Sequence, residues 1–164
     1  MLVTRPKGQE RELVGLLQAA GYAVVHCPLI AVEPLGDDPI DLTGYDWLVV
    51  TSANGAREIE RRRGAGRPRV AAIGRATAEA IGGADLVPRV STLEGLLAEM
   101  PRPAGRVLFA GAEGARRLLV RELDADFVPL YRTIELAPEL PDADLVVLAS
   151  ASAARAFGRL GRQL

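Results

Sequence analysis

The sequence predicts an α/β fold in which parallel sheets are covered by helices, divided between two domains. Three observations lead to this prediction. Short apolar runs alternate with segments whose apolar residues recur every three or four positions, the pattern of successive strands and amphipathic helices. Two proline-containing stretches, residues 29–43 and 135–142, interrupt this series. A strand–loop–helix unit near residue 51 also occurs a second time near residue 149.

The first 28 residues predict a strand, a helix and a second strand. Residues 2–4 are apolar and are followed by Arg5 and a proline. A stripe of leucines and alanine at helical spacing then runs from Leu13 to Ala20, where Gly21 ends it. Residues 23–25 are a second apolar run. Two strands joined by a helix in this way normally lie parallel in one sheet.

The stretch at residues 29–43 carries prolines that disfavour a helix, so we expect it to be an extended linker. A longer β/α series follows. Its predicted strands are residues 47–50, 69–73, 86–87, 106–109 and 127–131. Its predicted helices are residues 54–63, 77–81, 92–99 and 116–122. After the second linker, residues 135–142, we expect a last strand at 145–148 and a last helix at 152–160.

Two linkers indicate a chain that starts one domain, leaves it to build a second, and then returns. The first domain is predicted to comprise residues 1–33 and 134–164, and the inserted domain residues 36–131. Two crossings of this kind make a hinge, and we expect a cleft beside it.

The repeated unit pairs residues 51–55 (Thr-Ser-Ala-Asn-Gly) with residues 149–153 (Ala-Ser-Ala-Ser-Ala), at a constant offset of 98 positions from Thr51 to Ala149. Ser52 thereby aligns with Ser150, and Asn54 with Ser152. Repeated α/β units indicate duplicated half-domains. At the same offset the counterpart of Gly74 falls near residue 172, past Leu164. We therefore expect the first domain to be incomplete at its C-terminus, with an unpaired sheet edge.

Composition argues against several classes of function. The formal net charge is −1 and the charges are scattered, whereas nucleic-acid-binding proteins show a basic excess or stripe. His26 and Cys27 are the only residues of their types, so we expect no disulfide framework and no metal site, and interpret them as a strand-end pair. No apolar run approaches the ~20 residues that span a bilayer, and no signal peptide begins the chain. A cytoplasmic protein without membrane or nucleic-acid partners is the expectation.

Small polar residues follow predicted strands and open predicted helices at Thr51, Ser52 and Asn54, and again at Ser150 and Ser152. Exposed backbone N–H groups and the positive end of a helix favour an anion at such a turn. Gly74, before another predicted helix, offers a comparable turn. The same residues also cap helices without a ligand, and that alternative stays open. The chain has neither a dinucleotide-binding glycine fingerprint nor a P-loop.

Few residues offer proton transfer. Tyr131 is predicted to end a strand just before the second linker, where its hydroxyl would face the cleft and act as a proton donor. A tyrosine at a strand end also packs its ring and hydrates its tip, which is the alternative interpretation. Arg5, at the end of the first strand, is a candidate for binding an anion. The alternative is that Arg5 is an ordinary surface residue.

Taken in order, these segments resemble the uroporphyrinogen-III synthase family across nearly the whole chain. The resemblance is carried by residues 2–6, by residues 28–30 (Pro-Leu-Ile), by residues 45–55 with their Thr-Ser-Ala-Asn-Gly, by residues 70–80 with their Ile-Gly-Arg-Ala-Thr, and by residues 131–133 (Tyr-Arg-Thr). Position 149 is alanine, where the family often has threonine. The chains of the family also continue past residue 164.

The resemblance implies two three-layer α/β domains, flavodoxin-like (HemD-like), joined by a two-segment linker with the substrate in the cleft. The implied substrate is hydroxymethylbilane, a linear tetrapyrrole with acetate and propionate arms. The implied reaction removes water, inverts the terminal pyrrole ring through a spiro intermediate, and closes uroporphyrinogen III without a metal or organic cofactor. A monomer is expected, with hydroxymethylbilane synthase, the preceding enzyme, as a candidate partner.

By the same resemblance, Tyr131 matches the tyrosine proposed to assist departure of the hydroxyl group. Thr51, Ser52 and Asn54 match a substrate-binding loop of the inserted domain, and Ser150 and Ser152 match its counterpart in the returning domain. Two alternatives to an enzyme remain open at this point. One is a non-catalytic tetrapyrrole-binding or regulatory module of the same fold, and the other is an unrelated binder of a polyanionic metabolite.

Overall fold

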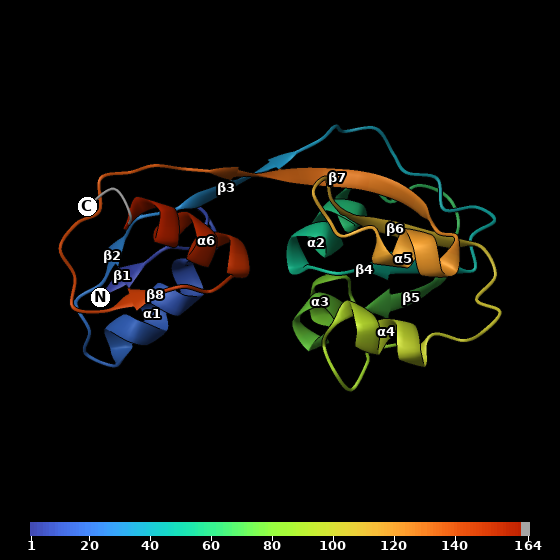
Figure 1. The fold of residues 1–164 in the computed structure, drawn as a ribbon, viewed down its shortest axis with the longest axis horizontal. Helices are drawn as coiled ribbons and strands as arrows, with labels where there is room; N and C mark the ends of the chain where they lie inside the picture. The colour runs from blue at the N-terminus through green and yellow to red at the C-terminus, as the bar shows by residue number, and fades with distance from the viewer. Residues whose placement is uncertain (162–164) are drawn as a thin grey trace. The chain divides into compact units, whose positions relative to one another are not determined.

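The computed structural model describes residues 1–161, which divide into two compact units (Figure 1). The first unit contains Met1–Glu33 and the described residues from Thr133 onward, and the second contains Pro34–Arg132. Both units are α/β, as the alternating apolar pattern predicts.

The first unit is built on a three-stranded parallel sheet of order β2-β1-β8. Its strands are β1 (Leu2–Val3), β2 (Val25–His26) and β8 (Val146–Val147). The central strand continues into Thr4, whose side chain is fully buried and donates a hydrogen bond to the Val147 carbonyl oxygen over 2.8 Å. This bond fixes the end of β1 against β8, although the two segments are far apart in the chain.

Two helices accompany this sheet, and they differ in burial. In α6 (Ala151–Leu160), Ala153 and Ala156 pack against Leu29 and Ile30 in a small core. The helix α1 (Arg11–Ala19) confirms the amphipathic pattern of the sequence, yet none of its residues is buried. Leu16, in the apolar stripe, is 64% exposed. The stripe therefore has little apolar cover within the described part of the chain.

The second unit contains most of a five-stranded sheet of order β3-β7-β6-β4-β5, in which β4, β5, β6 and β7 are parallel. The strands are β3 (Ile30–Pro34), β4 (Trp47–Val50), β5 (Arg69–Ala72), β6 (Val107–Ala112) and β7 (Asp126–Glu135). The prediction for β4 is confirmed to the residue. The Leu35 N–H donates to the Leu130 carbonyl oxygen, and the Leu136 N–H donates to the Leu29 carbonyl oxygen. These bonds show that β3 and β7 run antiparallel.

Helices cover both faces of this sheet. They are α2 (Ala53–Arg61), α3 (Arg75–Ala80), α4 (Leu93–Glu99) and α5 (Leu118–Leu123). Val49 and Phe109 share a core with Leu96 of α4 and Leu119 of α5. Successive residues of a strand point to opposite faces of the sheet. Leu48 and Val50, both fully buried, therefore face the other side, which α2 and α3 cover. The four β4–β7 strands thus lie between two helical layers.

Three predictions of element boundaries need correction. Strand β7 continues to Glu135, so Tyr131 lies within a strand and does not end one. Residues 86–87 form no strand, and Leu86 makes only an isolated bridge to Ala71. The first proline-containing stretch is extended as expected, but its start is the strand β3. Pro34, the last residue of β3, is tolerated because this strand is the edge of the five-stranded sheet.

Among the helices of residues 1–161, none combines the length and the apolar composition that crossing a bilayer requires.

Candidate functional site

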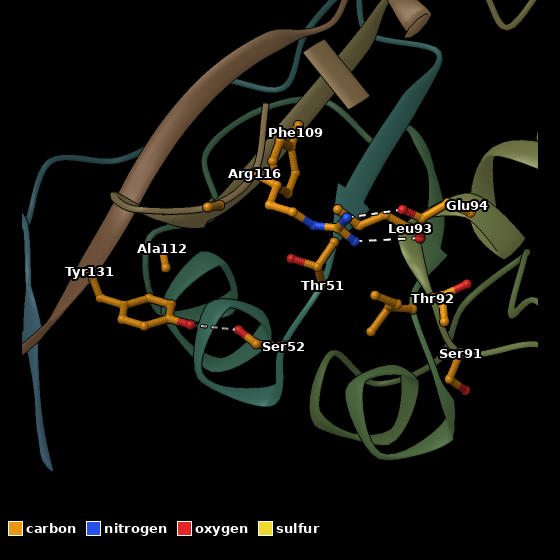
Figure 2. Close-up of a pocket in the computed structure, with 12 residues that line it drawn as sticks. Thr51, Ser52, Ser91, Thr92, Leu93, Glu94, Phe109, Ala112, Arg116 and Tyr131 are labelled. Atoms are coloured by element: carbon orange, nitrogen blue, oxygen red, sulfur yellow. Dashed lines mark hydrogen bonds and ion pairs between the residues drawn. The ribbon is translucent and has the colours of Figure 1, made fainter. Parts of the chain in front are cut away.

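A pocket of about 420 Å³ opens in the second unit, at the carboxyl ends of β4 and β6 (Figure 2). The chain leaves β4 into α2 and leaves β6 toward α5, and these helices cover opposite faces of the sheet. Ligands of open α/β sheets bind at such a switch point. The pocket is lined by Thr51, Ser52, Ile73, Ser91, Thr92, Leu93, Glu94, Phe109, Ala112, Ala115, Arg116 and Tyr131.

Ser52 is the N-cap of α2. Its backbone is extended, and its Oγ accepts a hydrogen bond from the Gly55 backbone N–H over 3.0 Å. In the repeated unit, Ser150 caps α6 with nearly the same backbone angles, and its Oγ accepts from the Ala153 N–H over 3.1 Å. The predicted duplication is therefore confirmed as a local structure, an extended serine that opens a helix. Capping of this kind satisfies an N–H group that the helix itself cannot.

Ser52 has a second partner, which the sequence did not indicate. Its Oγ lies 2.9 Å from the Tyr131 hydroxyl oxygen, and either group can be the donor. A β-bulge in β7 positions Tyr131 for this contact. Gly111 pairs with Pro129, but Ala112 pairs with Tyr131, so β7 has one residue more than β6 at this point. The shift turns Tyr131 away from the face where Phe127 packs and toward α2.

Burial and the hydrogen bond with Ser52 have opposite effects on the pKa of Tyr131. Its side chain is almost completely enclosed, and this desolvation raises the pKa of the phenol above its usual value, while the hydrogen bond with Ser52 lowers the pKa by a smaller amount. The phenol is consequently protonated at neutral pH. If Ser52 donates to Tyr131, the phenolic proton is available to a ligand in the pocket, while Ser52 Oγ still accepts from Gly55.

An ion pair lies at another part of the pocket wall. Arg116, in the turn between β6 and α5, donates to both carboxylate oxygens of Glu94 over 2.9 and 3.4 Å. Hydrogen bonds from Arg116 hold the pKa of Glu94 below its usual value, and the backbone at the start of α4 lowers it further. In Figure 2 this pair and the Tyr131–Ser52 pair lie on either side of Thr51.

Sequence reasoning missed both members of this pair. The signal was present for Arg116, because it follows a strand and a glycine-containing turn, as Thr51 and Ser52 follow β4. Nothing in the sequence links it to Glu94, which is 22 residues away in another loop.

Comparison with known proteins identifies the family. A family model described as uroporphyrinogen-III synthase HemD matches residues 11–164. The chain belongs to the uroporphyrinogen-III synthase family. It is 28% identical to a uroporphyrinogen-III synthase of Synechococcus elongatus, over 92% of this chain and 66% of that protein. It is 35% identical to a putative uroporphyrinogen-III synthase of Archaeoglobus fulgidus, over 85% of this chain and 62% of that protein.

A crystal structure of a mutant uroporphyrinogen III synthase from the extremely thermophilic bacterium Thermus thermophilus has a similar fold, with a TM-score of 0.58 and 16% sequence identity. The likeness covers 83% of this chain and 63% of that one. The chain thus spans about two thirds of the length of the curated relatives that it matches.

The residues singled out by the resemblance to uroporphyrinogen-III synthases lie at different distances from the pocket. Thr51, Ser52 and Tyr131 line it. Asn54 lies in the first turn of α2, where its Oδ1 accepts a 3.4 Å hydrogen bond from Arg57. Gly74 begins α3 with extended backbone, and a Cβ there would lie 3.0 Å from the hydroxyl oxygen of Ser91, which lines the pocket. Asn54 and Gly74 are therefore next to the lining residues and not among them.

The remaining predicted residues belong to the first unit. Ser150 and Ser152 are hydrogen-bonded to one another through their hydroxyls over 3.1 Å. The Arg5 guanidinium donates to the Gln9 carbonyl oxygen over 3.1 Å, which holds it against the loop before α1. His26 bonds the Arg5 carbonyl oxygen over 2.8 Å.

Within residues 1–161, no three His, Cys, Asp or Glu side chains are gathered as ligands of one ion would be. The pocket lining combines hydroxyl groups with the guanidinium of Arg116 and the carboxylate of Glu94. Hydroxyls and a guanidinium are groups that bind carboxylates.

Proposed function

We propose that this chain is a uroporphyrinogen-III synthase that converts hydroxymethylbilane to uroporphyrinogen III, with inversion of the terminal pyrrole ring and loss of water. The observation that carries the proposal is the Tyr131–Ser52 hydroxyl pair. It lines a pocket at the carboxyl ends of parallel strands, in a chain that belongs to this family. A protonated phenol is the group that the first step of such a reaction needs.

In the proposed mechanism, Tyr131 donates its proton to the hydroxyl group of the substrate as the carbon–oxygen bond breaks, and water leaves. The electron-poor terminal carbon then reacts with the last pyrrole ring to give the spiro intermediate, which reopens and closes with that ring inverted. Ring closure releases one proton, and the Tyr131 phenolate takes it up. Ser52 stabilises the phenolate through its hydrogen bond, so Tyr131 ends in the state in which it began.

Binding a flexible chain in one conformation supplies much of such catalysis. We propose that the hydroxyls of Thr51 and Ser52, with the turns at Asn54 and Gly74, hold carboxylate arms in the second unit. The N-terminal N–H groups of α2, a helix of nine residues, favour an anion there. In the first unit, Ser150, Ser152 and Arg5 are proposed to bind further arms, since Ser150 opens α6 in the same geometry.

The proposal extends to organisation. Residues 1–33 and 134–164 would form one domain and residues 36–131 the inserted one, with β3 and β7 as the two segments of the linker. We expect a cytoplasmic monomer that needs no cofactor and takes its substrate from hydroxymethylbilane synthase. Light scattering after gel filtration measures the oligomeric state, and a dimer would contradict that part of the proposal.

The decisive experiment mixes the full chain with freshly generated hydroxymethylbilane and separates the isomers of the product. Formation of the type III isomer above background is expected. Only the type I isomer, which hydroxymethylbilane forms spontaneously, would overturn the proposed activity. Tight binding of uroporphyrinogen III without turnover would also overturn it, and would favour a regulatory module of the same fold.

A further inference from the structure

Arg116 is the one positive charge among the residues that line the pocket. Its side chain is 64% exposed, and its guanidinium donates two hydrogen bonds to one carboxylate, that of Glu94. The planar fork of an arginine matches the two oxygens of a carboxylate, which gives this cation a specific preference as well as a charge. The pocket therefore contains a carboxylate-binding group that an internal carboxylate occupies.

The contact with Glu94 is of the kind that another anion replaces easily. Both side chains are more than half exposed, so water and salt screen their attraction, and exposed pairs of this type contribute little to stability. Glu94 also has other support, since backbone hydrogen bonding in the first turn of α4 helps to keep it ionised. Glu94 remains stable as a carboxylate on α4 when Arg116 turns to a ligand.

We propose that Arg116 receives a carboxylate arm of the ligand and that Glu94 occupies this position in the free protein. The inference rests on the proposed function, because it takes the ligand to be a tetrapyrrole with acetate and propionate arms. Exchange of one carboxylate for another keeps Arg116 paired throughout. Glu94 competes with every carboxylate, so ligands that make further contacts in the pocket, such as those to Thr51 and Ser52, are retained over simple anions.

A matched control exists in the same unit. Arg106 pairs with Asp126 over 3.0 Å, with similar exposure (59% and 54%, against 64% and 60% for Arg116 and Glu94). Arg106 immediately precedes β6, whereas Arg116 follows that strand, so the two cations lie at opposite ends of it. Removing Arg106 lowers the net charge as removing Arg116 does, without changing the pocket.

The test is a calorimetric titration of the full chain with uroporphyrinogen III under anaerobic, reducing conditions. Arg116→Gln is expected to raise the Kd roughly tenfold, because a charge-assisted pair to the ligand is lost. Glu94→Gln is expected to lower the Kd about threefold, because the competing carboxylate is gone. Arg106→Gln should leave the Kd within about twofold. A gain of affinity in Glu94→Gln cannot come from misfolding, so this variant keeps the test informative.

Two results would overturn the inference while the proposed function stands. One is equal weakening by Arg116→Gln and Arg106→Gln, which would show a general charge effect. The other is weaker binding by Glu94→Gln, which would show that Glu94 supports the ligand. In both cases the chain would still produce the type III isomer.

A second measurement does not depend on tetrapyrrole chemistry. Isotope-labelled arginine side chains are followed by NMR while mellitate, a benzene hexacarboxylate, is added. The Arg116 Nε–H signal is expected to shift, and Arg106 to change little. If Arg116 responds to mellitate but no tetrapyrrole binds or reacts, the carboxylate-receiving role stands and the proposed function fails. An unresponsive Arg116 with both probes would overturn the inference.

Discussion

The hydroxyl oxygen of Tyr131 lies 2.9 Å from Ser52 Oγ, although the two residues are 79 positions apart in the chain. The same Ser52 oxygen caps α2 by accepting from Gly55. A helix start and a candidate acid are thus joined through one oxygen atom. Three predictions concern Tyr131 and Ser52, and a fourth concerns glycines in α4 and α6.

Replacing Tyr131 with phenylalanine should lower turnover far more than affinity. The ring and its packing are kept, while the proton donor is removed, so we expect a loss of roughly 100-fold in turnover and little change in Kd. Formation of the type III isomer and titration with uroporphyrinogen III measure the two effects. Tyr45→Phe is the control, because Tyr45 bonds Asp126 outside the pocket lining. Equal turnover by both variants would return Tyr131 to a packing role.

Ser52→Ala and Ser150→Ala remove the same cap from two helices. Each should lower the free energy of unfolding by about 1 kcal/mol, the usual cost of a lost serine N-cap. Only Ser52→Ala should also raise the pKa of Tyr131, since its hydrogen bond lowers that pKa in the native protein. Chemical denaturation measures the first effect, and ultraviolet titration of tyrosinate measures the second. A rise in the Tyr131 pKa in Ser150→Ala would contradict the assignment.

Alkaline pH should destabilise the protein through Tyr131. Burial raises the folded-state pKa above the ordinary value of 10.0, so the native protein keeps the phenolic proton where the unfolded chain has lost it. This contribution to stability is complete below about pH 10 and is lost progressively as the pH rises through the folded-state pKa. Denaturation midpoints measured across this range should fall less steeply for Tyr131→Phe than for the native chain. Equal slopes would show that Tyr131 is not protected from solvent.

Two helical glycines should respond oppositely to alanine. A Cβ at Gly95 would collide with the carbonyl oxygen of Val90, which forces the start of α4 to move, so we expect a loss of roughly 1–3 kcal/mol. A Cβ at Gly158 in α6 would have no neighbouring atom within 4 Å, so alanine there should stabilise by roughly 0.5–1 kcal/mol. Thermal unfolding of both variants measures the difference. Stabilisation by Gly95→Ala would show that the loop before α4 yields readily.

Strands, helices and turns opened by serine could be predicted from the sequence, because burial and helix capping produce residue patterns that repeat within a few positions. Trp47–Val50 is four apolar residues between polar neighbours, and its strand was found as predicted. Contacts between segments that are distant in the chain produce no such local pattern. The Tyr131–Ser52 bond depends on the register of β7 against β6, and the Arg116–Glu94 pair depends on two loops that meet only in the folded unit.

The same reason explains the incorrect boundaries. Asp126–Glu135 is longer than its apolar part because hydrogen bonding to neighbouring strands continues through polar residues. Leu86 and its apolar neighbour have the composition of a strand. Only Leu86 makes a bridge, to Ala71, because the chain turns away after Pro88. Apolar content shows where a strand is buried, and its ends are set by its partners.

The bulge between Pro129 and Tyr131 makes the candidate site sensitive to the number of residues before Tyr131 more than to their kinds. A strand alternates its faces at every step, so one further residue between Phe127 and Tyr131 would direct the phenol to the opposite side of the sheet, whereas loss of the extra residue Leu130 would leave the tyrosine paired with Ala112. An added residue there would remove the acid in one event, with its tyrosine still encoded.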